Sequence, residues 1–162
     1  MPVQSEIMIQ AIARALGDMR EEVVFVGGCV APLLVDAPAR ADARMTEDID
    51  FMLEAITLVD YYRFADRLKE KGFTEDMTAD GPLCRWKLSV GGAILIVDSM
   101  PTEADVLGFA NEWYPKAFAG AQRYALTEDL DIRLIGSLHF LATKFVAWAQ
   151  RGQGDMAHKD IE

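Results

Sequence analysis

The segment Val23–Val26 is a continuous run of β-branched and aromatic residues that stops at Gly27-Gly28. A run this short, apolar at every position, is typical of a strand that is covered on both faces. Such a strand belongs to a sheet with other elements packed against it. The segment therefore predicts a layered fold that combines strands and helices.

Three longer segments predict helices, at residues 4–19, 58–71 and 136–150. The first has apolar residues at steps of three and four, and the second is closed by Gly72 as its C′ residue. In the third, an apolar stripe runs along one face of the helix, as in helices that pack on a core. Its members are Leu138, Leu141, Phe145 and Trp148.

Strands are also predicted at residues 48–53, 85–90 and 93–97, with an edge strand at 73–75. Gly91-Gly92 predicts a two-residue hairpin between two of them. The remaining segments are a loop at 36–46, a short helix near 105–111 with irregular chain up to 130, and a strand or helix lead-in at 132–135. The fold class is thus α/β (α+β), a small mixed sheet flanked by helices. Residues 1–130 are expected to form the main domain and 131–162 a C-terminal helical segment packed on it.

The composition limits the range of partners. The chain has 162 residues and a formal net charge of −10, which argues against broad nonspecific binding of nucleic acid. Five cations are candidates for a local basic edge: Lys69, Lys71, Arg85, Lys87 and Lys116. We expect Cys29 and Cys84 to be reduced, buried thiols. The chain shows no signal peptide and no apolar run of 18 residues, so no membrane partner and a cytoplasmic location are expected.

Two carboxylates in the second predicted strand stand one residue apart. Asp48 and Asp50 point to the same face, with Cα atoms about 6–7 Å apart from the rise of a strand. Like charges this close repel each other unless a cation offsets them, and one divalent ion can bridge both groups. The alternative is a solvated strand face that is polar on one side by simple alternation.

Two further features join this pair. Gly27-Gly28 lies between a strand and a helix, where glycine lets a ligand approach the backbone and free N–H groups favour phosphate. Asp98 ends the apolar run 93–97, where it is either a site carboxylate or a turn residue. Together, a phosphate-binding turn and three carboxylates could form a two-metal phosphoryl-transfer site. Asp98 would then bind the second ion and help to activate the attacking hydroxyl.

These motifs resemble the nucleotidyltransferase superfamily, and within it the AbiEii-like toxins of bacterial toxin–antitoxin systems. The resemblance rests on four patches of the sequence between residues 23 and 162. They are Val24-Phe25-Val26-Gly27-Gly28, Arg44-x-Thr46-x-Asp48-Ile49-Asp50-Phe51, Val97-Asp98, and the tail with Lys144-Phe145-Val146-Ala147-Trp148, Arg151-Gly152 and Asp155-x-x-x-Lys159-Asp160-Ile161. One departure is that Gly28-Cys29 replaces the hydroxyl residue that often follows the first glycine, so phosphate binding would rest on backbone N–H groups.

The resemblance implies a nucleotidyltransferase-like fold and a role for each matched position. Asp48, Asp50 and Asp98 would bind Mg²⁺, or Mn²⁺, and carry the catalysis. Six further residues would bind the nucleotide or support its loop: Gly27, Gly28, Arg44, Thr46, Lys144 and Asp155. From its sequence context alone, Lys144 is either a phosphate-binding cation or a lysine that covers the edge of the apolar stripe.

The implied activity is the transfer of a nucleoside monophosphate from an NTP to an acceptor hydroxyl. The acceptor is a tRNA, a protein or a small molecule, and a cognate antitoxin would accompany the toxin-like assignment. One alternative is an aminoglycoside-type nucleotidyltransferase, for which Glu103 and Asp105 could contact a cationic acceptor. The other is a catalytically weak module on the same fold that binds a nucleotide or a partner protein.

Overall fold

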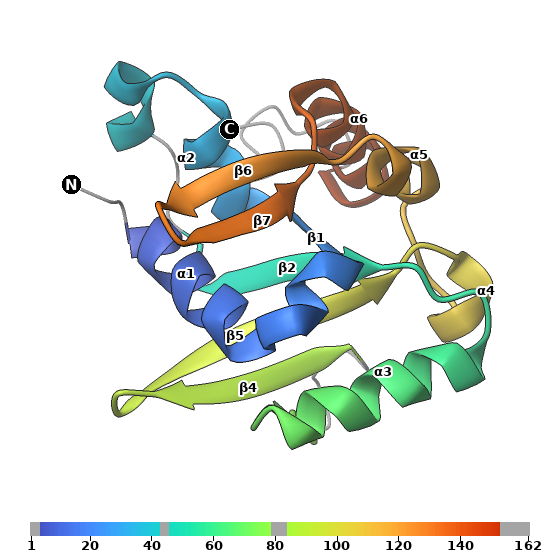
Figure 1. The fold of residues 1–162 in the computed structure, drawn as a ribbon. Helices are drawn as coiled ribbons and strands as arrows, with labels where there is room; N and C mark the ends of the chain where they lie inside the picture. Colours follow the sequence, from blue (N-terminus) through green and yellow to red (C-terminus); the bar gives the residue numbers. More distant parts are fainter. Residues whose placement is uncertain (1–3, 43–45, 79–83, 153–162) are drawn as a thin grey trace.

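The computed structural model describes residues 4–42, 46–78 and 84–152. Its centre is a seven-stranded mixed sheet in the order β3-β4-β5-β2-β1-β7-β6 (Figure 1). The strands are β1 Val23–Val26, β2 Asp48–Leu53, β3 Thr74–Glu75, β4 Arg85–Val90, β5 Ala93–Pro101, β6 Gln122–Thr127 and β7 Leu130–Leu134. The helices are α1 Gln4–Leu16, α2 Ala31–Leu34, α3 Leu58–Glu70, α4 Ala104–Leu107, α5 Tyr114–Ala119 and α6 Ser137–Ala147. The mixed α/β class is therefore as predicted.

The strand β2 lies at the middle of the sheet. It pairs antiparallel with β1 and parallel with β5, while β1 pairs parallel with β7. Two antiparallel hairpins, β4–β5 and β6–β7, extend the sheet on either side. The two ends of the sheet are thus built from local contacts and its centre from contacts between distant segments.

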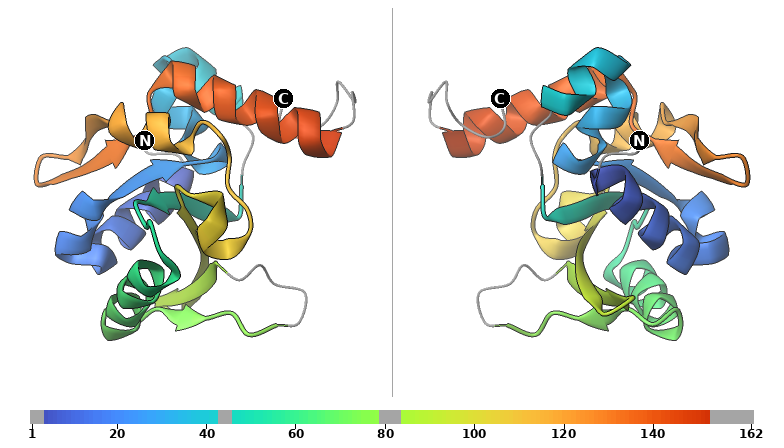
Figure 2. Two further views of the ribbon diagram at one scale, coloured as in Figure 1. Left: turned by 90° about the vertical axis from the view of Figure 1, so that its right-hand side faces the viewer. Right: turned by 90° about the vertical axis from the view of Figure 1, so that its left-hand side faces the viewer.

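Alternation along β2 separates the core from the polar face. Ile49 and Phe51 are fully buried, and the Phe51 ring packs edge-on against Phe25 and Phe64, with ring centroids 6.1 Å apart in each pair. Phe64 belongs to α3, which with α1 covers one face of the sheet (Figures 1 and 2). The side chains of Asp48 and Asp50 therefore lie on the opposite face.

Several elements have the predicted bounds, and others differ from the prediction. The strands at 23–26, 48–53 and 85–90 are confirmed, but β5 continues to Pro101 because it pairs in parallel with β2 as far as Leu53. Asp98 is therefore inside a strand and not at its end. The short helix predicted near 105–111 is α4, at Ala104–Leu107, but the prediction of irregular chain after it was wrong, since that region holds α5 and β6. The loop at 36–46 likewise contains a 3₁₀ helix, Ala37–Asp42.

The last helix forms where it was predicted, but its apolar stripe does not pack on the core. Leu138 is 82% exposed, and Leu141 and Phe145 are about half exposed. α6 continues into a π-helical turn, Trp148–Gly152, and extends past the body of the protein in Figure 2. A helical period thus predicted the helix correctly and its buried face incorrectly. In the described part of the chain, no helix has the length and apolar character that a membrane span needs.

Candidate functional site

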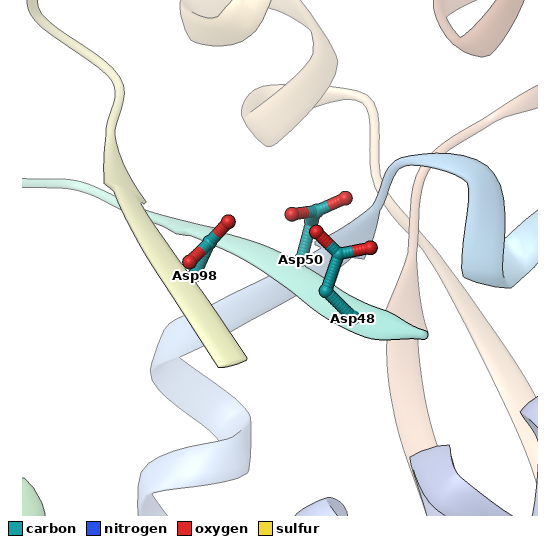
Figure 3. Close-up of side chains that lie close together, drawn as sticks. All are labelled: Asp48, Asp50 and Asp98. Atoms are coloured by element: carbon teal, nitrogen blue, oxygen red, sulfur yellow. The ribbon is translucent and has the colours of Figure 1, made fainter. Parts of the chain in front are cut away.

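The three predicted carboxylates meet on one face of the sheet. β2 and β5 are parallel neighbours in a register that places Asp50 beside Asp98, and Asp48 lies two residues before Asp50 on the same face. Each residue offers a carboxylate oxygen, and these oxygens lie within 4.8 Å of one another (Figure 3). Asp98 is buried, whereas Asp48 and Asp50 are half-buried. The sequence thus correctly predicted that the three residues would lie together.

Arg85 is a fourth charged member of this site, and the sequence analysis did not place it there. Its Nε donates to Asp98 Oδ1 and its Nη2 to Asp98 Oδ2, both at 2.8 Å. The same Nη2 lies 3.4 Å from Asp48 Oδ2. The bonds to Asp98 raise the pKa of the Arg85 guanidinium further above its usual value. Arg85 therefore stays charged and binds both oxygens of the most buried carboxylate.

The position of Arg85 beside Asp98 could have been predicted from the Gly91-Gly92 hairpin. Gly91-Gly92 forms the predicted two-residue turn, so Val90 pairs with Ala93. Counting outward from this turn brings Arg85 opposite Asp98. The turn therefore fixes which residues of the two strands lie opposite each other, and this register predicts the ion pair.

The pKa of Asp50 is strongly shifted by its burial and by the charges around it. Burial and the neighbouring charges of Asp48 and Asp98 raise the pKa of Asp50 to about 7. Lys144 and Arg85 act in the opposite direction and lower that pKa. A carboxylate whose pKa is raised in this way by like charges is typical of a group of ligands whose negative charge a bound cation can offset. The oxygen donors also suit hard divalent ions such as Mg²⁺.

Gly27 makes room for the side chain of Asp50. A Cβ on Gly27 would lie 2.0 Å from Asp50 Oδ2, and the backbone of Gly27 has φ 75° and ψ −172°, a region that only glycine adopts readily. The space at Gly27, where phosphate was expected to approach the backbone, is therefore filled by the Asp50 carboxylate. Gly27 is a residue that positions Asp50.

Gly28 lies beside the two other predicted nucleotide-binding residues. A Cβ on Gly28 would lie 2.6 Å from Thr46 Cγ2 and 3.9 Å from Lys144 Nζ. Lys144 Nζ also lies over the Phe140 ring, 5.8 Å from its centroid, so the ammonium group is held between an aromatic face and the glycine turn. Gly28, Thr46 and Lys144 thus form one corner of the site.

The turn after Gly27 differs from the expected helix start. It is a 3₁₀ turn, Gly28–Val30, followed by α2 with only four residues. Cys29 is buried, its thiol lies 3.1 Å from the Val26 carbonyl oxygen, and burial raises its pKa. Cys29 therefore serves the core and leaves the glycine turn without a side-chain hydroxyl. Of the predicted nucleotide-binding residues, Arg44 and Asp155 lie outside the described residues.

The other cations that could have formed a basic edge are engaged on separate elements. Lys69 pairs with Glu75, Lys71 with Asp18 and Lys87 with Asp76. Lys116 Nζ lies 5.1 Å from the centroid of the Trp113 ring. Arg85 and Lys144, in contrast, are cations whose charges act on Asp50.

A small pocket of about 150 Å³ lies apart from the carboxylates, between α3 and the end of β2. Its charged groups already have structural partners. Arg67 binds both oxygens of Glu22, and Asp60 forms the capping box of α3 with Thr57. These contacts are structural, so the acidic cluster is the candidate site.

Comparison with known proteins supports the fold. No family model matches the chain, and no curated protein matches it. A similar solved structure is that of an antigenic nucleotidyltransferase-like protein from Paracoccidioides brasiliensis. The match has a TM-score of 0.61 and 19% sequence identity, and it covers 98% of this chain and 72% of the other. The chain therefore has a nucleotidyltransferase-like fold, with an acidic cluster able to hold a metal ion.

Proposed function

We propose that the protein is a metal-dependent nucleotidyltransferase that moves a nucleoside monophosphate from an NTP to an acceptor hydroxyl. The observation that carries the proposal is the convergence of Asp48, Asp50 and Asp98 within 4.8 Å, beside the glycine turn and Lys144. Three carboxylates on one face repel each other, and Arg85 offsets the charge of Asp98 and part of that of Asp48, so a divalent cation would offset the negative charge that remains. A nucleotidyltransferase-like fold supplies a setting in which such a cluster acts on a nucleotide.

Each part of the site has a proposed role. The three carboxylates are the ligands for Mg²⁺ or Mn²⁺, which would offset the negative charge of the triphosphate and of the leaving pyrophosphate. Lys144, together with backbone N–H groups of the turn at Gly28, binds phosphate oxygens as fixed positive charge. Thr46 packs beside that turn, and its hydroxyl donates to the Asp48 carbonyl oxygen at 3.4 Å, which supports the start of β2. Gly27 holds the place of the Asp50 carboxylate, while Arg44 and Asp155 keep their proposed roles in binding the nucleotide.

In the transfer itself, the acceptor oxygen forms a bond to the α-phosphorus as the bond to pyrophosphate breaks. The proton of the acceptor hydroxyl must leave, and we assign its removal to Asp98. Asp98 is the most buried of the three carboxylates, so it can accept that proton away from bulk water.

The finer assignment is the AbiEii-like toxin group, with a tRNA or protein acceptor, a cytoplasmic setting and a cognate antitoxin. We propose that residues 1–130 form the catalytic domain and that residues 131–162, which begin within β7 of the sheet and are helical after it, form the C-terminal segment that contributes Lys144. A small-molecule acceptor of the aminoglycoside type is the second candidate. The net charge of −10 favours a cationic acceptor, and Glu103 and Asp105 are exposed at the start of α4.

The Arg85–Asp98 pair favours one further alternative. Because it satisfies the buried carboxylate without a metal, the fold could persist as a catalytically weak module that binds a nucleotide or a partner protein. Metal-dependent binding of an NTP separates the enzyme from a module that binds only a partner protein, and transfer of the nucleoside monophosphate separates it from a module that binds a nucleotide without catalysis.

The test is calorimetric binding of each NTP in the presence and absence of Mg²⁺ or Mn²⁺. The wild type is compared with Asp48→Ala/Asp50→Ala and with the control Glu47→Ala/Glu54→Ala. The control removes two exposed carboxylates that flank the same strand, so both variants change the net charge equally. We expect binding that requires the metal, is lost in the first variant and is kept in the control. If no NTP binds with either metal, the enzymatic function is wrong and the interaction module remains.

A further inference from the structure

The three carboxylates of the site have unequal partners. Asp98 receives two N–H groups of Arg85, and Asp48 lies within 3.4 Å of one of them. Lys144 approaches from the other end, at the Gly28 turn. A bidentate guanidinium occupies the lone pairs of both carboxylate oxygens that face it, so Asp98 is left with only its remaining lone pairs for another cation.

We infer that Arg85 is a tethered counter-cation that occupies the metal site from the β4 side and sets its affinity for a divalent ion. The inference rests on the proposed function, because it assumes that the cluster binds a metal. In the metal-free protein, Arg85 neutralises Asp98 and part of the charge on Asp48. When a divalent ion binds, Arg85 gives up Asp98 as its partner.

The burial of Asp98 explains why such a cation is needed. Asp98 is 7% exposed, and a buried carboxylate with no partner strongly destabilises a fold. Two further carboxylates within 4.8 Å add repulsion. Arg85 removes the first cost and reduces the second when no metal is present, and this allows the chain to fold before it binds its ion.

The geometry also explains how Arg85 can give way. Its side chain is 28% exposed, so the guanidinium has a route into solvent from the edge of the site. Its register opposite Asp98 is fixed by the Gly91-Gly92 turn, whereas its contacts at the tip are side-chain contacts that can exchange. The backbone thus keeps Arg85 in reach of the cluster in both states.

Lys87 provides a matched control on the same strand. It lies two residues beyond Arg85 and therefore on the same face, but its ammonium pairs with Asp76 at 3.0 Å and not with the cluster. Replacing either residue by glutamine removes one positive charge. Any general effect of net charge on metal binding is therefore present in both variants.

The test measures Mn²⁺ and Mg²⁺ binding without nucleotide, by calorimetry, together with thermal unfolding in EDTA and with added metal. For Arg85→Gln we expect metal binding roughly tenfold tighter than in the wild type, from the loss of charge-assisted bonds that compete with the ion. We also expect a lower melting temperature in EDTA and a larger rise on adding Mg²⁺. For Lys87→Gln we expect a change of less than about threefold, since the ammonium group of Lys87 pairs with Asp76 and not with the cluster.

Arg85→Lys keeps the positive charge but loses the bidentate hydrogen bonds to Asp98, so its metal affinity should lie between those of the wild type and Arg85→Gln. It also allows the test if Arg85→Gln does not fold. If the wild type binds metal but Arg85→Gln and Arg85→Lys bind it no more tightly than Lys87→Gln, this inference is wrong and the proposed function stands. If the wild type, the Arg85 variants and Lys87→Gln all fail to bind metal, both are wrong.

Discussion

Gly27 is the residue at which the backbone and the chemistry of the site depend most directly on each other. The carboxylate of Asp50 fills the space that any side chain at position 27 would need. The same residue ends β1 with a backbone conformation that L-amino acids avoid. One glycine therefore both ends the buried strand and lets a carboxylate reach the centre of the cluster.

This dependence predicts the effect of Gly27→Ala. We expect a loss of about 3 kcal/mol in the free energy of unfolding, from backbone strain and the contact with Asp50, and a loss of metal binding because the carboxylate must move. Gly92→Ala is the control, because Gly92 has φ 84° but no atom within 4 Å of its Cβ position. It should cost about 1–2 kcal/mol and leave metal binding unchanged. Chemical denaturation and Mn²⁺ calorimetry measure both effects, and equal metal binding in the two variants would contradict this role of Gly27.

At the scale of whole elements, the sequence predicts strands better than it predicts their environment. The strand at 48–53 and the carboxylates of Asp48 and Asp50 on its polar face follow from alternation alone. Alternation does not show which strand pairs with β2. The parallel pairing with β5 joins segments about 50 residues apart and leaves no local signal in the sequence. For the same reason, the extension of β5 past Asp98 depends on β2 and was missed.

The segment after β5 shows a second limit. α5 has six residues, which is too short for a helical period to stand out from chance. β6 is recognisable only through its partner β7, with which it forms a hairpin at the edge of the sheet. The three carboxylates and the strands that carry them could be predicted from the sequence, whereas α5 and β6, which follow β5, could not.

The exposed face of α6 yields a prediction at this scale. Leu138→Gln and Leu141→Gln should each change the free energy of unfolding by no more than about 0.5 kcal/mol, because both side chains are largely solvent-exposed. Ile132→Ala in β7 is the control for a buried apolar residue and should cost about 2–5 kcal/mol. Urea denaturation compares the three. A large loss in either leucine variant would mean that this face is covered in solution.

For the whole molecule, the acidic cluster and the net charge of −10 both make the folded protein less stable as the pH rises. Raising the pH adds negative charge both to the surface and to a site that already holds three carboxylates. The metal-free protein is therefore expected to be most stable in mild acid. Asp50 is the group in the described residues whose pKa shift fixes the pH range of this effect.

The sign follows from the two pKa values of Asp50. The ordinary pKa of an aspartate is 3.8, and in the folded protein burial and the charges of Asp48 and Asp98 raise it to about 7. Between these values the folded state keeps a proton that the unfolded state has lost, so the free energy of unfolding falls as the pH rises from about 4 to about 7. In contrast, the pKa of Asp129 is lowered to about 2 by its bonds to Thr127 and Arg14, so that any contribution from Asp129 lies in a separate range, below pH 4.

Asp50→Asn should remove most of this dependence in EDTA. The variant has no proton to lose at position 50, so its free energy of unfolding should vary less with pH between 4 and 7, and near neutral pH it should exceed that of the wild type. Glu103→Gln is the control, since it removes one exposed carboxylate and changes the net charge equally. Urea denaturation at intervals from pH 4 to pH 8 gives the three curves. If the curve of Asp50→Asn is parallel to that of the wild type, Asp50 does not carry the pH dependence, and the surface charge shared with the control does.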